Sequence, residues 1–88
     1  MTHELETHPE PFQATLDGLA PFEVQLDDRH YEIGDLLRLR EWDPKTDMKY
    51  PNGYTGREVT VRLTYLARGR SWGLPAGLCI LGVARLNA

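Results

Sequence analysis

The sequence is short of the side chains on which most metal and nucleophilic sites depend. It has one cysteine, one serine and three histidines, and the histidines are not spaced as metal ligands. The one thiol, Cys79, cannot form an internal disulfide, and its place in the apolar run 78–81 predicts a buried, unreactive side chain. Ser71 has no histidine near it in the sequence to act as its base. We therefore expect no metal and no cofactor, and the composition favours a binding module over an enzyme.

Long apolar runs are also missing, and the first residues form neither a basic nor an apolar leader. This excludes a membrane role and predicts a cytoplasmic protein. The net charge of −3 gives no overall attraction for a nucleic-acid backbone, so any such contact must come from a local patch. With only 88 residues, we expect one domain over residues 1–88 with a continuous core.

The order of apolar and polar residues predicts a mainly β, α+β fold. Five segments have strand patterns: 3–7, 22–27, 36–42, 58–65 and 78–86. Prolines near the start and a glycine near the end predict one short helix between His8 and Gly18. So many short strands leave exposed edges, which a small, partly closed barrel of about five strands and one N-terminal helix would manage.

Alternation also predicts which side chains face the core. In the segment 22–27 we expect the apolar residues to point inward and Glu23 to point away, which would bury Phe22, Val24 and Leu26. In the segment 58–65 the same rule would bury Val59, Val61, Leu63 and Tyr65. The continuous apolar run 78–86 is typical of a central strand covered on both faces.

Between residues 43 and 56 the composition changes to proline, glycine and asparagine, which predicts a long surface loop. Its larger residues suggest contact with the body of the domain, and we expect a mobile flap beside a cleft. Because Trp42 precedes the loop and Tyr54 closes it, the two ends should lie side by side.

One group of basic and aromatic residues suggests a binding function. On a strand, Arg38, Arg40 and Trp42 project from the same face, and Arg62 lies on the next predicted strand. Guanidinium groups beside an indole suit stacking on an unpaired base and pairing with phosphate. The alternative is that the arginines pair with nearby carboxylates and the tryptophans fill the core.

Several blocks of the sequence resemble a known family. They include 9–12 (PEPF), 33–43 (IGDLLRLREWD) and 54–59 (YTGREV), within matching blocks that run from His3 to about Tyr65. The chain is similar to a small bacterial and phage family of the domain-of-unknown-function 3850 type. That family belongs to the PUA-like superfamily, close to the ASCH (activating signal cointegrator homology) domains. The resemblance implies a PUA-like barrel with a cleft beside the helix, in a superfamily associated with RNA or modified nucleosides.

Some small ASCH-like relatives are amidohydrolases of acylated cytidines, with a catalytic lysine and threonine at fixed places after a glycine. In this chain Ala20 and Glu23 occupy those places, and Gln25 stands where near relatives have arginine. The only lysines, Lys45 and Lys49, fall in the long loop. The resemblance therefore implies that the catalytic side chains of these hydrolases are missing.

We predict a PUA-like binding module for single-stranded RNA or a nucleotide-like ligand. Its expected ligand-binding residues are His3, Glu23, Arg38, Arg40, Trp42 and Arg62. Two alternatives remain from the sequence. One is a small amidohydrolase of modified nucleosides, and the other is a non-catalytic protein-interaction domain that forms a homodimer through an exposed strand edge.

Overall fold

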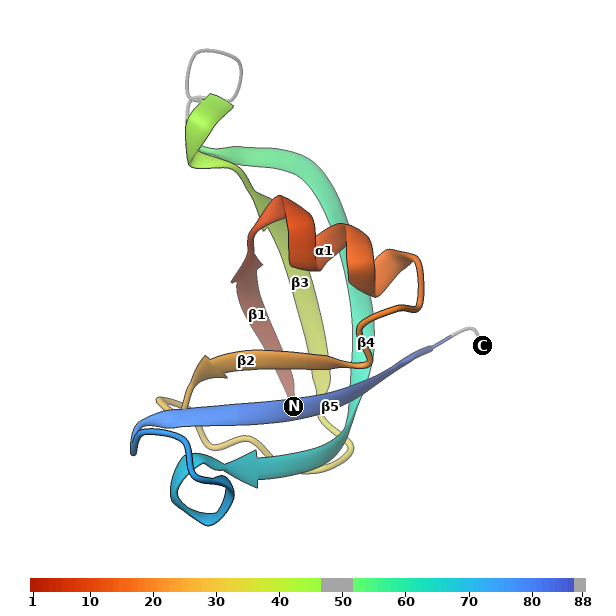
Figure 1. Ribbon diagram of the computed structural model, residues 1–88. Helices are drawn as coiled ribbons and strands as arrows, with labels where there is room; N and C mark the ends of the chain where they lie inside the picture. The colour runs from red at the N-terminus through yellow and green to blue at the C-terminus, as the bar shows by residue number, and fades with distance from the viewer. Residues whose placement is uncertain (47–51, 87–88) are drawn as a thin grey trace.

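Five strands form one curled sheet with a single short α-helix packed against it (Figure 1). The computed structural model describes residues 1–46 and 52–86. The elements are β1 (Thr2–Thr7), α1 (Pro9–Leu16), β2 (Phe22–Leu26), β3 (Leu36–Trp42), η1 (Pro44–Thr46), β4 (Tyr54–Arg68), η2 (Gly69–Trp72) and β5 (Leu78–Arg85). The predicted mainly β, α+β fold with about five strands is confirmed, in the form of a curled half-barrel. Among the described residues, no helix is long and apolar enough to cross a membrane.

The strand order is β1-β3-β4-β5-β2, so β1 and β2 are the two edges of the sheet. β1 pairs with β3 in parallel, and the other three pairs are antiparallel. β4 is the longest strand, and it pairs with β3 along its first half and with β5 along its second half. The bend of β4 visible in Figure 1 carries the sheet from one half to the other and curls it.

The core lies on the concave side of this sheet. Its members are Leu5, Phe12, Tyr31, Leu37, Leu39, Val61, Leu63, Cys79, Leu81 and Val83. α1 begins with proline in its first turn, as its sequence predicts, and it contributes the fully buried Phe12. The buried Leu5 and Cys79 are confirmed, and burial raises the pKa of the Cys79 thiol, as expected of an unreactive cysteine.

The orientation predicted for β2 is wrong. Phe22, Val24 and Leu26 are 49%, 53% and 61% exposed, whereas Glu23 is only 5% exposed. The register explains the inversion, because Glu23 lies opposite the buried Leu81 and therefore shares its inward face. Alternation shows that two faces differ, but it does not show which face meets the core. Here the polar face of an edge strand points inward.

A second correction concerns β4. Val61 and Leu63 are fully buried as predicted, but Tyr65 is 53% exposed. A β-bulge falls between Leu63, which lies opposite Val83, and Tyr65, which lies opposite Gly82. The extra residue shifts the alternation, so that Tyr65 points outward.

β5 lies between β4 and β2, so its central position is confirmed. Its two faces are not equally covered. Cys79, Leu81 and Val83 are buried, while Leu78, Ile80 and Gly82 are only partly buried. The outer face of β5 is covered less completely than the sequence predicts, because no second layer of the described chain extends over all of it.

The loop predicted from 43 to 56 is shorter in the structure, because η1 occupies Pro44–Thr46 and β4 begins at Tyr54. Trp42 lies opposite Tyr54 in the sheet, which confirms that the two ends of the loop are side by side. The Trp42 indole N–H donates to the carbonyl of Asn52 at 2.9 Å. Gly53 has φ +84°, and a Cβ there would collide with the indole. Residues 47–51 lie outside the described residues, so the mobile flap stays a prediction.

Candidate ligand-binding cleft

A cleft of about 500 Å³ lies between the two edge strands, where the curled sheet is not closed. β1 contributes residues 6–7 to its wall, β2 contributes residues 22–25, and His8, Pro11 of α1 and Ala20 complete it. The volume is in the range of small-molecule sites. The inward face of β2, with its polar Glu23 and Gln25, therefore lines a cleft beside the helix.

Glu23 is the buried acid of this cleft. Thr15 Oγ1 lies 3.1 Å from Glu23 Oε2 and 3.0 Å from the carbonyl oxygen of Pro11. Burial raises the pKa of Glu23, and hydrogen bonds from the side chains of Thr15 and Gln25 act in the opposite direction. A hydroxyl has one proton, so Thr15 shares it between the Pro11 carbonyl and the Glu23 carboxyl group, both of which accept. Burial is the largest of these effects, so the net direction of the pKa shift of Glu23 is upward.

Thr7 adds an unsatisfied polar atom to the same cleft. Its side chain is buried, and its Oγ1 makes no hydrogen bond with the described part of the chain. Buried hydroxyl groups are normally paired, so an orphaned one at the wall of a cleft is available to a ligand. Glu23 and Thr7 thus offer hydrogen-bonding groups from opposite edges of the sheet.

An aromatic contact connects the cleft to the end of β3. The ring of His8, at the wall of the cleft, lies 5.6 Å from the ring of Trp42 between centroids. Trp42 is partly buried, and its orientation is fixed by its hydrogen bond to Asn52. The predicted site residue Trp42 therefore lies one side chain away from the cleft, where its fluorescence can report on binding.

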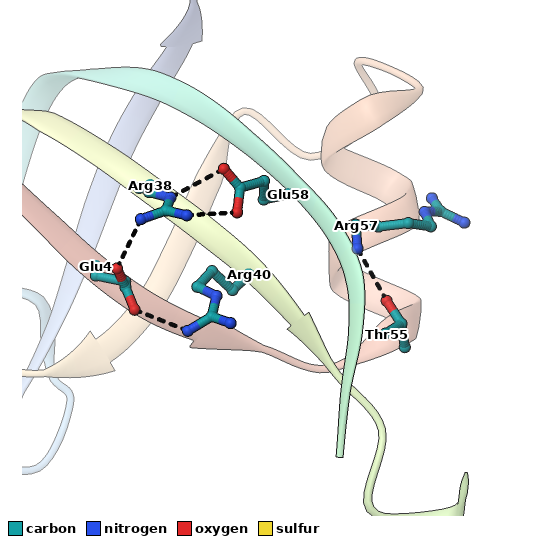
Figure 2. Close-up of polar contacts among 6 residues, drawn as sticks. All are labelled: Glu4, Arg38, Arg40, Thr55, Arg57 and Glu58. Carbon is teal, nitrogen blue, oxygen red and sulfur yellow. Dashed lines mark hydrogen bonds and ion pairs between the residues drawn. The ribbon is translucent and has the colours of Figure 1, made fainter. Parts of the chain in front are cut away.

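Two of the predicted arginines, Arg38 and Arg40, lie on the outer face of the sheet and are paired with carboxylates (Figure 2). Arg38 donates two hydrogen bonds to Glu58, at 2.9 and 2.8 Å, and one to Glu4 at 3.0 Å. Arg40 donates to Glu4 at 2.9 Å and lies over the ring of Tyr54, 4.0 Å from its centroid. The ion pairs raise the pKa of Arg38 and lower that of Glu58. Pairing of the arginines with nearby carboxylates is the alternative that the sequence left open, and Arg38 and Arg40 adopt it.

Arg62 lies beside this network, opposite Leu36 in the sheet, and its side chain is exposed. Over residues 1–46 and 52–86, nothing forms a hydrogen bond or ion pair with it. Together with Arg38 and Arg40 it faces Glu4 and Glu58, so the patch has nearly balanced charge.

His3 is buried at the opposite end of β1. Its Nε2 lies 2.8 Å from Asp35 Oδ2, and its ring meets Tyr31 edge to face at 4.8 Å. Asp35 also accepts hydrogen bonds from the backbone of Glu32 and from the amino group of Met1. Four residues of extended strand, roughly 13 Å, separate His3 from Thr7. His3 joins the start of β1 to the start of β3, away from the cleft.

Acid titration should expose the contribution of this cluster. Hydrogen bonds from His3 and the backbone of Glu32 lower the pKa of Asp35 to about 2. Its contribution to stability is therefore present above the unfolded pKa near 4 and is lost as the pH falls toward 2. We expect Asp35→Asn to lower the unfolding free energy at pH 7 and to flatten its decline between pH 4 and 2. Urea unfolding at a series of pH values measures both, with Asp28→Asn as the exposed control.

Comparison with known protein families identifies one whose model matches most of the chain. Residues 2–83 match the family model described as "Domain of unknown function (DUF3850)". The chain belongs to the DUF3850 family. It is also 34% identical over 70 residues, 80% of its length, to an "Uncharacterized 12.9 kDa protein in GpA 3'region" of Escherichia phage P2. The aligned part spans 58% of that phage protein.

The DUF3850 resemblance made from the sequence is thus confirmed at the level of the family. Ala20 lines the cleft. Lys45 lies in a different hollow with Glu10 and Pro44, and Lys49 lies outside the described residues. None of the cleft-lining side chains in the described part of the chain is a lysine. Over the same described ranges, no group of three potential metal ligands occurs.

Of the predicted site residues, the structure places Glu23 in the cleft and Trp42 next to its wall, and it does not bring His3 or the three arginines there. Sequence reasoning missed Thr7 and Thr15. The alternation of β1, which buries Leu5, also points Thr7 inward and could have identified it. The contact between Thr15 and Glu23 depends on how α1 packs, and the sequence has no signal for it.

Proposed function

We propose that this DUF3850 domain is a PUA-like binding module that takes a small, planar, polar ligand of the nucleoside type in the cleft between β1 and β2. The observation that carries the proposal is a buried acid, Glu23, at the wall of an open cleft. Natural selection for stability alone would place an apolar residue at Glu23, since a carboxyl group is costly to bury. Its retention there is explained by a ligand that hydrogen-bonds to it.

The chemistry of the cleft supports a nucleobase-like edge. Glu23 accepts a hydrogen bond from Thr15 at Oε2, which leaves Oε1 as an acceptor for a ligand, and the Thr7 hydroxyl can donate or accept. Nucleobases offer adjacent donors and acceptors on one planar edge, which suits such a pair. The apolar surfaces of Pro11 and Ala20 would cover the faces of the ring.

The PUA-like assignment is supported by the curled half-barrel and by the cleft beside α1. Long single-stranded RNA has less support than a small ligand. The arginines that would bind its phosphates are paired with Glu4 and Glu58, which weakens their attraction for anions. We therefore favour the small ligand over the nucleic-acid strand.

Titration of the protein with the four common ribonucleosides and with N4-acetylcytidine tests the proposal. We expect at least one to bind saturably, to change Trp42 fluorescence and to shift the amide resonances of Thr7 and Glu23. Glu23→Gln should weaken this binding about tenfold or more, because the amide has one acceptor oxygen where the carboxyl group has two, so the hydrogen bond to either Thr15 or the ligand is lost. The matched control is Glu32→Gln, the same change at an exposed side chain.

Two results would contradict the proposal. One is the absence of saturable binding with every nucleoside while the protein is folded. The other is binding of short single-stranded RNA that Arg38→Gln abolishes and Glu23→Gln leaves intact, which would move the site to the outer face of β3.

A further inference from the structure

A second hollow lies beside Thr15, the residue that donates a hydrogen bond to Glu23. It has a volume of about 440 Å³ and is lined by Thr15, Gly18, Ala20, Pro21, Val83 and Arg85, with Val61 at its base. We call it the Arg85 hollow. Ala20 lines both this hollow and the cleft, and Thr15, which lines the hollow, contacts Glu23, which lines the cleft. The two spaces are thus neighbours separated by one pair of side chains.

Arg85 is the charged residue of this wall. It ends β5, on the same inward face as Leu81 and Val83, and its Nη1 donates to the Leu16 carbonyl at 2.8 Å. Its side chain is exposed, and its remaining donors form no hydrogen bond with a described residue. In contrast to Arg38, Arg40 and Arg68, it has no carboxylate partner within residues 1–46 and 52–86. An open guanidinium beside a hollow is suited to an anion.

The register fixes how far Arg85 lies from Glu23. Glu23 pairs with Leu81, and Arg85 follows Leu81 by four residues on the same strand, which is roughly 13 Å along an extended chain. An arginine side chain covers part of that span, and the sugar of a nucleotide would cover the rest. Ala20, in the loop between α1 and β2, lines both spaces, so the ligand would cross from one to the other beside it. Figure 1 shows this loop passing beside the end of β5, and Val83 N–H donates to the Pro21 carbonyl at 3.0 Å.

From this arrangement we infer that the ligand is a nucleotide, whose base lies on Glu23 in the cleft and whose phosphate binds Arg85 in the Arg85 hollow. The inference rests on the proposed function and adds the phosphate to it. Glu23 would then bind the base, and Arg85 would bind the phosphate.

Arg85 also has a plain structural role, because it holds a carbonyl at the C-terminal end of α1. That role alone predicts a loss of stability in Arg85→Gln that is equal with and without ligand. It predicts no difference in how the protein binds a nucleoside and its phosphate. The two roles are therefore separable by measurement.

The experiment compares each ribonucleoside with its 5′-monophosphate by calorimetric titration at low salt, with inorganic phosphate as a further probe. For the wild-type protein, we expect the monophosphate to bind about tenfold or more tightly than the nucleoside, as one charge-assisted contact allows. Added salt should reduce this ratio. Arg85→Gln should bring the ratio close to one, and Arg85→Lys should restore part of it. Arg70→Gln, which makes the same charge change at an exposed residue of η2, should leave the ratio unchanged.

The inference is wrong if the phosphate adds no affinity, or if its gain survives in Arg85→Gln, and in either case nucleoside binding at Glu23 would still support the proposed function. If neither nucleosides nor nucleotides bind the folded protein, both ideas fail together. Two-dimensional amide spectra of each variant establish that it is folded. Binding of inorganic phosphate alone, lost in Arg85→Gln but without any effect of the base, would assign the hollow to a free anion and overturn the nucleotide.

Discussion

Phe12→Ala is expected to lower the free energy of unfolding by about 3–5 kcal/mol, the usual loss when a fully buried phenylalanine is truncated. Phe12 is the side chain by which α1 enters the core, and the guanidinium of Arg57 lies over its ring, 5.1 Å from the centroid. Arg57 also donates to Gln13 at 2.7 Å, which holds the same helix against β4. The cavity would loosen both contacts, and a domain of this size has only about 4–13 kcal/mol of stability.

Urea unfolding followed by far-ultraviolet circular dichroism measures this loss. Leu26→Ala is the informative control, because the sequence predicts Leu26 in the core and the structure exposes 61% of it. We expect it to cost less than about 1 kcal/mol. Equal losses at Phe12 and Leu26 would mean that β2 is turned the other way, with its apolar face inward.

Glu23→Leu is expected to make the domain more stable by about 1–2 kcal/mol while it abolishes binding in the cleft. An apolar residue of similar size removes the cost of burying the carboxyl group, and Thr15 keeps its contact with Pro11. Such an exchange of stability against function is typical of binding sites. Thermal unfolding and the nucleoside titration, applied to the same variant, measure the two effects.

The pH dependence of this gain has a defined sign. Burial raises the pKa of Glu23 in the folded state, so the wild-type protein loses stability as the pH rises from the unfolded pKa through the folded one. The leucine variant has no such group. The stability difference between the two proteins should therefore widen as the pH rises over this interval. A difference that is constant or narrows with pH would show that Glu23 is already ionised in the folded protein.

The sequence predicts the strands well because alternation and turn residues are local signals. Leu37 and Leu39 of β3 are buried as the pattern requires, and the prolines of α1 mark its start. Prediction from the sequence fails where contacts between distant segments decide which side chains are buried. β2 has a clean alternation with the wrong face inward, and the bulge before Tyr65 follows from pairing with β5, which is distant in the chain.

The candidate site is predicted less completely for the same reason. The sequence predicts that Glu23 binds the ligand, but it places Glu23 on a strand face directed away from the core. The arginines were the stronger sequence signal, yet their partners Glu4 and Glu58 come from two other strands, 34 and 20 residues away. Spacing along one strand places Arg38 and Arg40 on one face, but it does not show which carboxylates lie opposite them.

The position of the cleft between β1 and β2 affects how readily these two edge strands open. Each of these edge strands has one neighbour in the sheet, so each is held by a single ladder and opens more readily than β3, β4 or β5. A ligand that contacts Thr7 on one edge and Glu23 on the other would stand in for the strand pairing that the curled sheet lacks. The ligand would join the two edge strands reversibly. The amides of β1 and β2 would therefore exchange their hydrogens more slowly as the occupancy of the cleft by ligand rises.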